Sequence, residues 1–306
     1  MSAVANSRQW RQAAALFGAL LLCEGGTLAQ TGALVDRSEL KICADPNNLP
    51  FSNEKKEGFE NKIAELLGAE LGLKVDYVWF PQVIGFVRNT LRARLCDLVM
   101  GTVAGDDTMQ TTNPYYFTTH VMLYRSDKGL GLSGPQDPRL ATIRLGVVAG
   151  TPPADLLVRY DLMAHTKPYA LMVDTRFESP THDMVQDIVD GTIDVGFLWG
   201  PIAGYYRKRD ALPLTLVPLK SEPGAARMAY HIAMGVRANE PEWRRLINAA
   251  ILKHQTEITA ILHEYGIPLL NEQGELASQC RYARDATRDR AARDPFLFGL
   301  CARGQL

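Results

Sequence analysis

The chain has 306 residues, of which 46% are hydrophobic and 22% charged, a composition typical of a folded protein with room for two domains. Its 33 basic and 34 acidic side chains leave a formal net charge of -1. This balance gives no general attraction to nucleic acid or to acidic membranes, so we expect neither as a partner.

The first 29 residues differ from the rest of the chain. Two arginines precede an apolar run over residues 13–22, and small residues lead up to Ala29. This order predicts a secretory signal peptide, cleaved after Ala29, and therefore a periplasmic protein. A lipoprotein signal ending at Cys23 is the alternative, but the bulky Leu22 stands where such a signal needs a small residue. No later apolar run is long enough to predict a membrane-spanning helix.

A strand–loop–helix–strand unit begins at Leu40. Residues 40–44 predict a strand, the Asp-Pro-Asn-Asn that follows predicts a turn, helical spacing runs over residues 59–72, and residues 74–80 predict a second strand. This order is the βαβ unit of a parallel sheet, in which ligands bind beyond the carboxyl ends of the strands. We therefore predict that the loop forms one wall of a binding cleft. Its candidate residues are Asn47, Asn48 and Phe51.

The next stretch extends the same sheet. Apolar positions at helical spacing predict an amphipathic helix over residues 85–95, whose arginines are expected to face solvent. The apolar residues that follow Cys96 predict a buried strand. Gly101 and Thr102 end that strand at the level of the first loop, so both are candidate cleft residues.

Residues 114–125 are predicted to leave the first lobe. Tyr115, a further cleft candidate, precedes an alternating strand over residues 120–125 that is long enough to cross to a second lobe. The loop over residues 129–138 contains a GxGxxG spacing, but prolines stand where a nucleotide-binding fingerprint needs a helix. We therefore interpret this loop as a connector.

A second strand–loop–helix set starts with a strand over residues 143–148. Gly150, Thr151 and Asp155 follow, at the start of a helix that runs to Tyr160. Thr151 suits the N-cap of this helix, and the proline after it suits the first turn. Capping explains these residues as well as an anion-binding site facing the cleft does.

The rest of the second lobe is predicted to alternate strands and helices before the chain returns to the first lobe. A buried strand over residues 193–199 ends in Trp199 and Gly200, both candidate cleft residues. The other predicted elements are strands over residues 173–177, 214–219 and 229–236, and helices over residues 184–190, 202–208 and 241–265, the last divided in two.

Outside the signal peptide the chain has four cysteines, Cys43, Cys96, Cys280 and Cys301. An even number in an exported chain predicts disulfides, and no CxxC motif or Cys/His cluster indicates zinc. Cys43 and Cys96 lie in neighbouring predicted strands, so one arrangement pairs them and joins Cys280 to Cys301. The pairing stays open, because four cysteines allow three connectivities. A further alternative leaves Cys43 and Cys96 as buried free thiols and keeps only the bridge in the tail.

No set of residues predicts catalysis. The six histidines are scattered without metal-ligand spacing, and no GxSxG nucleophile motif is present. We therefore expect a protein that is not an enzyme and that holds neither a metal nor a cofactor of its own.

A family resemblance rests on an ordered series of strings between Leu40 and Leu270: LKICAD, GFENKIAELLGAELG, CDLVMGT, NPYY, LGVVAGT and GTIDVGFLWGP. They resemble the type II periplasmic solute-binding proteins, the receptors of ABC importers. CADPNNLPFSN, GFVRNTL and WGPIAGYY are similar to one subgroup, the MoxJ/XoxJ type associated with PQQ-dependent methanol and alcohol dehydrogenases.

The resemblance implies an α/β fold of two lobes, each a mainly parallel sheet with flanking helices, joined by two crossover strands. We expect the first lobe to comprise residues 38–122 and 234–270 and the second lobe residues 123–233. Residues 271–306 would form a C-terminal extension.

The chain departs from this family at two charged positions. Polar amino-acid receptors of the superfamily place an arginine after the strand matching CDLVMG, and an aspartate after the strand matching DVGFL, to bind the ligand carboxylate and ammonium. Here residues 103–110 contain no arginine, and Trp199 takes the place of the aspartate. A bound amino acid would leave both charges largely unpaired, which costs several kcal/mol in a desolvated cleft.

The resemblance and these departures imply an accessory of a PQQ-dependent alcohol dehydrogenase, with or without its cytochrome c. It would engage the enzyme for activation or maturation, and Trp199, Tyr115 and Phe51 would supply aromatic contact area. The alternative is an ABC-transporter substrate-binding protein for a small solute other than a standard amino acid.

Overall fold

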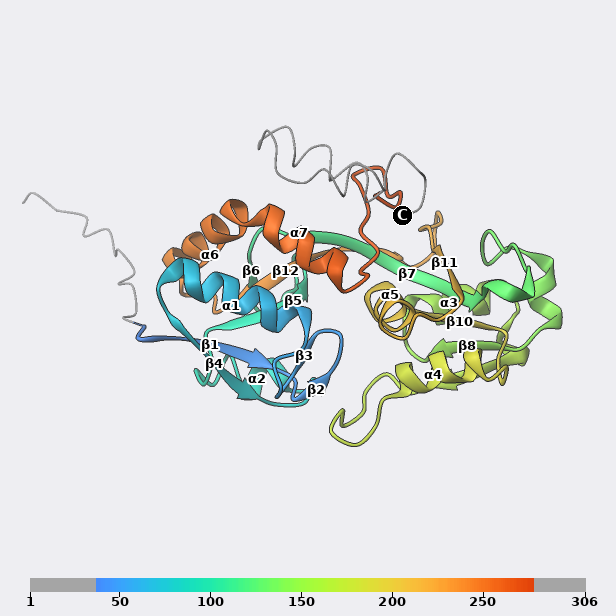
Figure 1. The fold of residues 1–306 in the computed structure, drawn as a ribbon, viewed down its shortest axis with the longest axis horizontal. Helices are drawn as coiled ribbons and strands as arrows, with labels where there is room; N and C mark the ends of the chain where they lie inside the picture. The colour runs from blue at the N-terminus through green and yellow to red at the C-terminus, as the bar shows by residue number, and fades with distance from the viewer. Residues whose placement is uncertain (1–36, 278–306) are drawn as a thin grey trace, which may run out of the picture. The chain divides into compact units, whose positions relative to one another are not determined.

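The computed structural model describes residues 37–277, which form an α/β fold with two lobes (Figure 1). The first lobe contains the strands β1 (Glu39–Ala44), β2 (Asn47–Asn48), β3 (Ser52–Asn53), β4 (Lys74–Trp79), β5 (Leu98–Val103) and β6 (Gln110–Thr111) and the helices α1 (Phe59–Leu71), α2 (Phe86–Asn89), α6 (Pro241–Lys253) and α7 (Gln255–Glu264). The second lobe contains the strands β8 (Leu145–Val148), β9 (Thr166–Tyr169), β10 (Val195–Trp199) and β11 (Leu214–Pro218), the helices α3 (Pro152–Arg159), α4 (Pro180–Val189) and α5 (Gly200–Arg209), and 3-10 turns at Ser126–Lys128, Pro138–Thr142 and Met163–His165.

Two long strands, β7 (Tyr116–Arg125) and β12 (Ala229–Val236), carry the sheet from one lobe to the other in the order β4-β1-β5-β12-β7-β10-β8-β9. As the βαβ order predicts, β1 is parallel to β4 and β5, and β8 is parallel to β10. β8 is also parallel to β9, a strand that the sequence patterns do not predict. The crossover strands are antiparallel to their neighbours. Residues 116–119 of β7 pair with β12, whereas residues 120–125 pair with β10 and β11, so β7 changes lobe by changing partners.

Each lobe has its own core. In the first lobe α1 buries Phe59, Ile63 and Leu67 against the sheet, because these apolar residues recur at helical spacing, and α6 and α7 complete the same cluster. The second lobe has two cores, one on each face of its sheet. Buried side chains of α4 pack on one face and those of α3 on the other. Between residues 37 and 277, no helix is long and apolar enough to cross a membrane.

The helix predicted over residues 85–95 is wrong in length, because α2 ends at Asn89. Apolar spacing continues beyond it, but the backbone instead makes turns, and Arg94 adopts a left-handed conformation at φ 59°. Leu91 is fully buried, and Arg237 donates hydrogen bonds to the carbonyls of Leu91 and Cys96. These tertiary contacts and the disulfide at Cys96 hold the segment in a conformation that its local spacing does not favour.

The strand predicted over residues 173–177 is also wrong. The sheet position beside β8 is taken by β9, which lies earlier in the chain. Residues 174–177 form a turn instead, in which the Asp174 carboxylate accepts hydrogen bonds from the backbone and guanidinium of Arg176. The backbone amide of Phe177 donates a hydrogen bond to the Asp174 carbonyl over 3.0 Å, an ordinary length, and this bond closes the turn.

The glycine-rich connector is confirmed as a loop. Gly129 and Gly131 have positive φ angles of 57° and 55°, and the next element is the 3-10 turn that starts at Pro138 rather than an α-helix. The spacing therefore lacks the helix amino end that a nucleotide phosphate needs.

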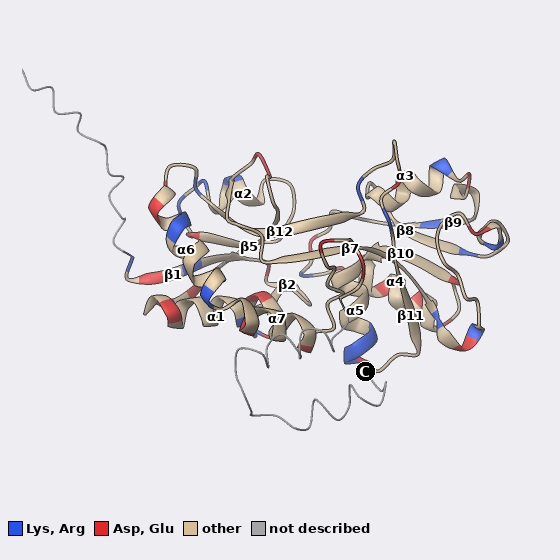
Figure 2. Ribbon diagram, turned by 90° about the horizontal axis from the view of Figure 1, so that it is seen from above, with Lys and Arg blue, Asp and Glu red and all other residues tan. Residues whose placement is uncertain are grey.

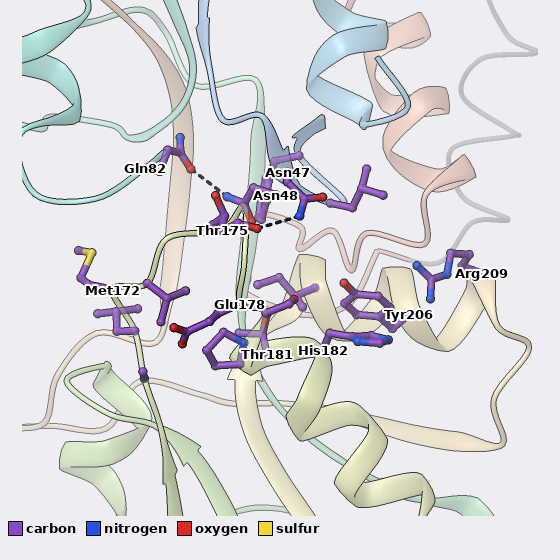
Figure 3. Close-up of a pocket in the computed structure, with 18 residues that line it drawn as sticks. Asn47, Asn48, Gln82, Met172, Thr175, Glu178, Thr181, His182, Tyr206 and Arg209 are labelled. Carbon is purple, nitrogen blue, oxygen red and sulfur yellow. Dashed lines mark hydrogen bonds between the residues drawn. The ribbon is translucent and has the colours of Figure 1, made fainter. Parts of the chain in front are cut away.

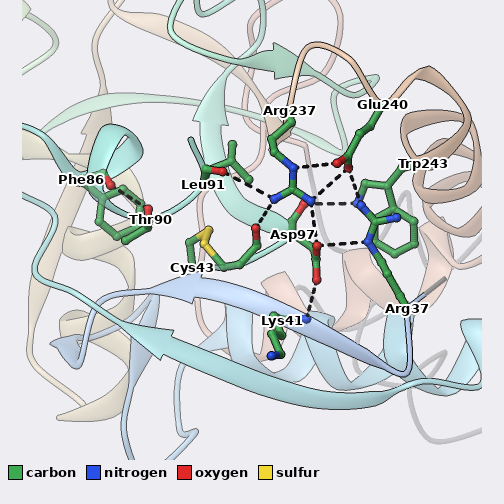
Figure 4. Close-up of a disulfide and its surroundings, with 11 residues drawn as sticks. Arg37, Lys41, Cys43, Phe86, Thr90, Leu91, Asp97, Arg237, Glu240 and Trp243 are labelled. Carbon is green, nitrogen blue, oxygen red and sulfur yellow. Dashed lines mark hydrogen bonds and ion pairs between the residues drawn. A yellow bond between two sulfur atoms is a disulfide. The ribbon is translucent and has the colours of Figure 1, made fainter. Parts of the chain in front are cut away.

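A disulfide joins Cys43 in β1 to Cys96, just before β5, with the Cα atoms 5.4 Å apart (Figure 4). This confirms the Cys43–Cys96 pairing among the arrangements that the sequence allowed. Cys280 and Cys301 lie outside the described residues, as do the predicted signal peptide and most of the C-terminal extension.

Beside this disulfide lies a buried ion network, which we call the brace: Arg37, Asp97, Arg237 and Glu240. Arg237 donates to Asp97 Oδ1 over 2.8 Å and to Glu240 Oε1 over 2.7 Å. Arg37 contacts the same two carboxylates, and its guanidinium carbon lies 4.2 Å from the centre of the Trp243 ring. The side chains are 6 to 15% exposed, so each buried charge has an opposite charge beside it.

Candidate functional site

A cavity of about 470 Å³ lies between the two lobes (Figure 3). The first lobe contributes the loop after β1 together with Gln82, and the second contributes residues 170–182 and one side of α5. The lining side chains are Asn47, Asn48, Leu49, Phe51 and Gln82 from the first lobe and Ala170, Leu171, Met172, Val173, Thr175, Glu178, Ser179, Pro180, Thr181, His182, Ile202, Tyr206 and Arg209 from the second.

The buried carboxylate of Asp45 organises one end of this cavity. Asp45 is 1% exposed, and its oxygens accept hydrogen bonds from the backbone of Asn47 at 2.9 Å and of Gln82 at 2.7 Å. The Thr175 hydroxyl of the second lobe donates a third bond, at 2.6 Å. The Asn47 side-chain amide in turn donates to the Thr175 carbonyl at 2.8 Å. A buried carboxylate needs such donors, so Asp45 fixes both cavity walls at this end.

At the other end of the cavity three side chains with planar groups, His182, Tyr206 and Arg209, contact one another in sequence. The Tyr206 ring lies 4.8 Å from that of His182, and the Arg209 guanidinium lies 4.7 Å from the centre of the Tyr206 ring. Arg209 also makes two hydrogen bonds to the Asp210 carboxylate, which offsets its charge. Glu178 is the one carboxylate in the lining. The lining is therefore close to neutral and suits a ligand or segment without strong charge.

Gly101 in β5 packs against a buried carboxyl group. A Cβ atom at Gly101 would lie 2.3 Å from Glu60 Oε1, so only glycine leaves room for this side chain. Burial, with the nearby Asp45 carboxylate as a smaller cause, raises the pKa of Glu60 to about 8. Glu60 is therefore protonated at neutral pH. Gly101 leaves the space that the Glu60 side chain occupies.

Thr102 lies at the end of β5 as predicted, but its hydroxyl is already bonded. It donates to Asp106 Oδ2 at 2.9 Å, and Asp106 also accepts from the backbone and hydroxyl of Thr108. A carboxylate thus lies in the loop where amino-acid receptors of the resembled family place an arginine. An anion would be repelled here rather than clamped.

Tyr115 belongs to the core of the first lobe. It is 2% exposed, and its hydroxyl donates to the Met100 carbonyl at 2.8 Å. A residue with this burial supplies no surface for a partner.

Trp199 lies where β10 meets the crossover strands and packs against the cores of both lobes. Its ring is half-buried, 4.7 Å from the ring of His120 and 6.0 Å from that of Tyr230. Burial lowers the pKa of His120 to about 4, so its ring is neutral and its Nδ1–H donates to the Met228 carbonyl. Trp199 is outside the lining of the 470 Å³ cavity.

The remaining predicted residues lie at helix starts. Thr151 is the N-cap of α3, but its hydroxyl donates to the Val148 carbonyl at 2.6 Å rather than to the helix. Gly150, with φ 73°, and Asp155 are exposed at the same end. Gly200 begins α5 in a crowded position, where a Cβ atom would lie 2.3 Å from the Thr119 carbonyl. The structure thus brings Asn47, Asn48 and Phe51 together at the cavity and places the others elsewhere.

Sequence reasoning missed the second wall of the cavity. Thr175 lies in the stretch whose pattern predicts a strand, and His182 lies in a stretch whose pattern predicts no function. Gln82 follows a predicted strand. Asp45 was interpreted as a turn residue only. A polar run between a strand and a helix was the available signal, but many surface loops have the same composition. Within the part of the chain that the structure describes, no three His, Cys, Asp or Glu side chains are placed to hold a metal ion.

Comparison with known proteins gives a consistent result. The family described as bacterial extracellular solute-binding proteins, family 3, matches residues 40–267. Protein MoxJ of Methylorubrum extorquens is 30% identical over 257 residues, covering 79% of this chain and 85% of that protein. Protein MoxJ of Paracoccus denitrificans is 30% identical over 269 residues, covering 81% and 96%.

Among solved structures, the periplasmic binding protein XoxJ from Methylobacterium extorquens is 38% identical with a TM-score of 0.66. The likeness covers 76% of this chain and 100% of that structure. The family match over residues 40–267 includes both lobes and the crossover strands described above. The chain therefore belongs to the family 3 bacterial extracellular solute-binding proteins and, within them, to the MoxJ and XoxJ type.

Proposed function

We propose that this protein is a non-enzymatic periplasmic accessory that engages a PQQ-dependent methanol or alcohol dehydrogenase for activation or maturation. The similarity to MoxJ and XoxJ is the observation that carries the proposal. The signal peptide predicted over residues 1–29 agrees with a periplasmic location.

The electrostatics of the cavity favour this function over amino-acid capture. The loop after β5, which is outside the cavity lining, contains Asp106 and no arginine, and Arg209 in the lining is already paired with Asp210. A zwitterion would therefore find no free cation for its carboxylate at these positions. A polyanionic cofactor such as PQQ would meet the same difficulty, so delivery of the cofactor through this cavity is disfavoured.

The rim of the cavity offers a surface for a partner. Leu171 and Met172 line it, follow one another in the chain and are 49% and 56% exposed, so together they offer an apolar contact area beside the cavity. Outside this rim, charged groups of both signs are spread over both lobes (Figure 2). We therefore place the contact with the dehydrogenase at the rim.

The test combines the purified protein with a PQQ-dependent alcohol dehydrogenase from the same organism. We expect co-elution and a change in the activated fraction of the enzyme, and no thermal shift with a panel of free amino acids. Met172→Asp should weaken the association about tenfold, because a charge would be buried in an apolar contact. Leu252→Asp is the matched control, since Leu252 is 80% exposed on α6 and away from the cavity lining.

Equal losses in the two variants would remove the rim from the proposal. Failure of the wild-type protein to associate, together with micromolar binding of a free amino acid, would refute the accessory function.

A second candidate is capture of a small neutral solute for an ABC importer, which the size of the cavity favours. A thermal shift with an uncharged solute, in a chain that has no effect on any dehydrogenase, would select this function instead.

A further inference from the structure

Residues 170–179, which we call the lid segment, lie between β9 and α4 and form part of the second-lobe wall of the cavity. Three of its large apolar side chains are exposed, Leu171, Met172 and Phe177, at 49%, 56% and 80%. Its internal hydrogen bonds centre on Asp174 and its neighbours. The lid segment therefore has little apolar burial to hold it in place.

Two hydrogen bonds tie the lid segment to the first lobe within residues 37–277. Both involve Thr175: its hydroxyl donates to Asp45 and its carbonyl accepts from the Asn47 side chain. Figure 3 shows Asn47 of the first lobe and Thr175 of the second lobe facing each other where the two cavity walls meet. Asp45 is 1% exposed, so water has little access to the carboxylate oxygen that accepts the hydrogen bond from the Thr175 hydroxyl.

The lobes meet elsewhere through a contact of a different kind. A Cβ atom at Gly204 in α5 would lie 2.1 Å from the Gly266 carbonyl oxygen, so the two backbones touch. The rings of Tyr205 and Tyr265 stack beside this point, with centroids 6.0 Å apart and an interplanar angle of 15°. This seam is packed backbone to backbone, whereas the lid segment is held by polar bonds that can open without creating a void.

We infer that the lid segment is a movable cover of the cavity, and that the Thr175–Asp45 hydrogen bond is the latch that keeps it closed. Opening this bond exposes the cavity to its occupant while the α5 seam stays in place. The inference does not depend on whether the occupant is a segment of a dehydrogenase or a solute. It assigns to Asp45 and Thr175 a gating role, separate from contact with the occupant.

Cleavage by trypsin after Arg176 provides the test, because Arg176 lies in the lid segment beside Thr175 and a protease needs the segment to open. Thr175→Val removes the hydroxyl and keeps the side-chain shape. We expect cleavage at Arg176 to become about tenfold faster, equivalent to about 1.4 kcal/mol of lost closure. Thr175→Ser should cleave at the wild-type rate because it keeps the hydroxyl.

Thr181→Val is the matched control, because it removes another hydroxyl from the same cavity wall without removing a bond to Asp45. Peptides covering residues 170–179 with Thr, Val or Ser at position 175 correct for any preference of trypsin itself. Equal rates in Thr175→Val and wild type would overturn the latch. Faster cleavage throughout the chain would also overturn it, since a latch supports the lid segment and not the fold.

Discussion

Two parts of the molecule reach the same cavity but are held in very different ways. In the first lobe β1 delivers Asp45 to the cavity two residues after Cys43, which is bonded to Cys96. The brace lies next to this disulfide (Figure 4). The lid segment belongs to the second lobe, and two hydrogen bonds at Thr175 join it to the first lobe. The difference indicates one fixed wall and one movable wall.

The largest effect should come from breaking the fixed wall covalently. The Cys43→Ala/Cys96→Ala variant opens a crosslink between residues 53 apart in the sequence. The free energy of unfolding should fall by about 4 kcal/mol, because the unfolded chain regains the freedom that the crosslink removed. Denaturant unfolding monitored by tryptophan fluorescence measures this fall. A stability equal to wild type would mean that the brace alone fixes β1.

The next effect should come from the brace. Arg237→Met removes the donor shared by Asp97 and Glu240 and leaves two nearly buried carboxylates with Arg37 alone. We expect a loss of about 3 kcal/mol in unfolding free energy. Arg245→Met is the control, because Arg245 pairs with Glu242 at the surface, where its side chain is 68% exposed, and should change stability by less than about 1 kcal/mol. Similar losses in the two variants would show that the brace adds nothing beyond a surface pair.

The smallest of these effects, measured per pH unit, concerns Glu60, at the cavity end of the fixed wall. Its folded pKa of about 8 lies above the usual 4.5, so between these pH values the folded state binds a proton that the unfolded state has lost. Stability should therefore decline as pH rises through this window, by at most about 1.4 kcal/mol per pH unit. Glu60→Gln should remove the decline, so its gain in stability over wild type should grow with each pH unit from pH 5 to pH 8.

Urea unfolding at pH 5, 6, 7 and 8 checks this prediction. Glu65→Gln, on the exposed side of the same helix, should leave the decline in place. Parallel pH profiles for wild type and Glu60→Gln would mean that Glu60 is ionised in the folded protein and that the fixed wall tolerates the charge.

Much of the fold follows from local patterns. The βαβ order around residues 40–80 and the strands predicted over residues 143–148 and 193–199 gave parallel pairs that the structure confirms. Helical spacing gave α1 and the α6–α7 pair, and the alternating strand after Tyr115 gave the crossover. These elements bury a regular stripe or face, and such burial leaves a clear period in the sequence.

Two of the failures have one cause in common. Residues 85–95 show helical spacing, yet Arg237 and the disulfide bend the segment into turns. Tyr115 has the aromatic character of a contact residue, yet Met100 and the core surround it. In both cases partners more than 10 residues away in sequence decide the outcome, and local pattern does not identify them.

The sequence by itself determined the two-lobed α/β fold, the family, the first cavity wall at Asn47, Asn48 and Phe51, and the absence of an arginine from the loop after β5. Only the tertiary structure decided that the lid segment forms part of the second wall, that Thr175 reaches Asp45, and that Trp199 packs between the two cores. The physical reason is that periodic burial is encoded residue by residue along the chain. A hydrogen bond between residues 130 positions apart exists only once both lobes have folded.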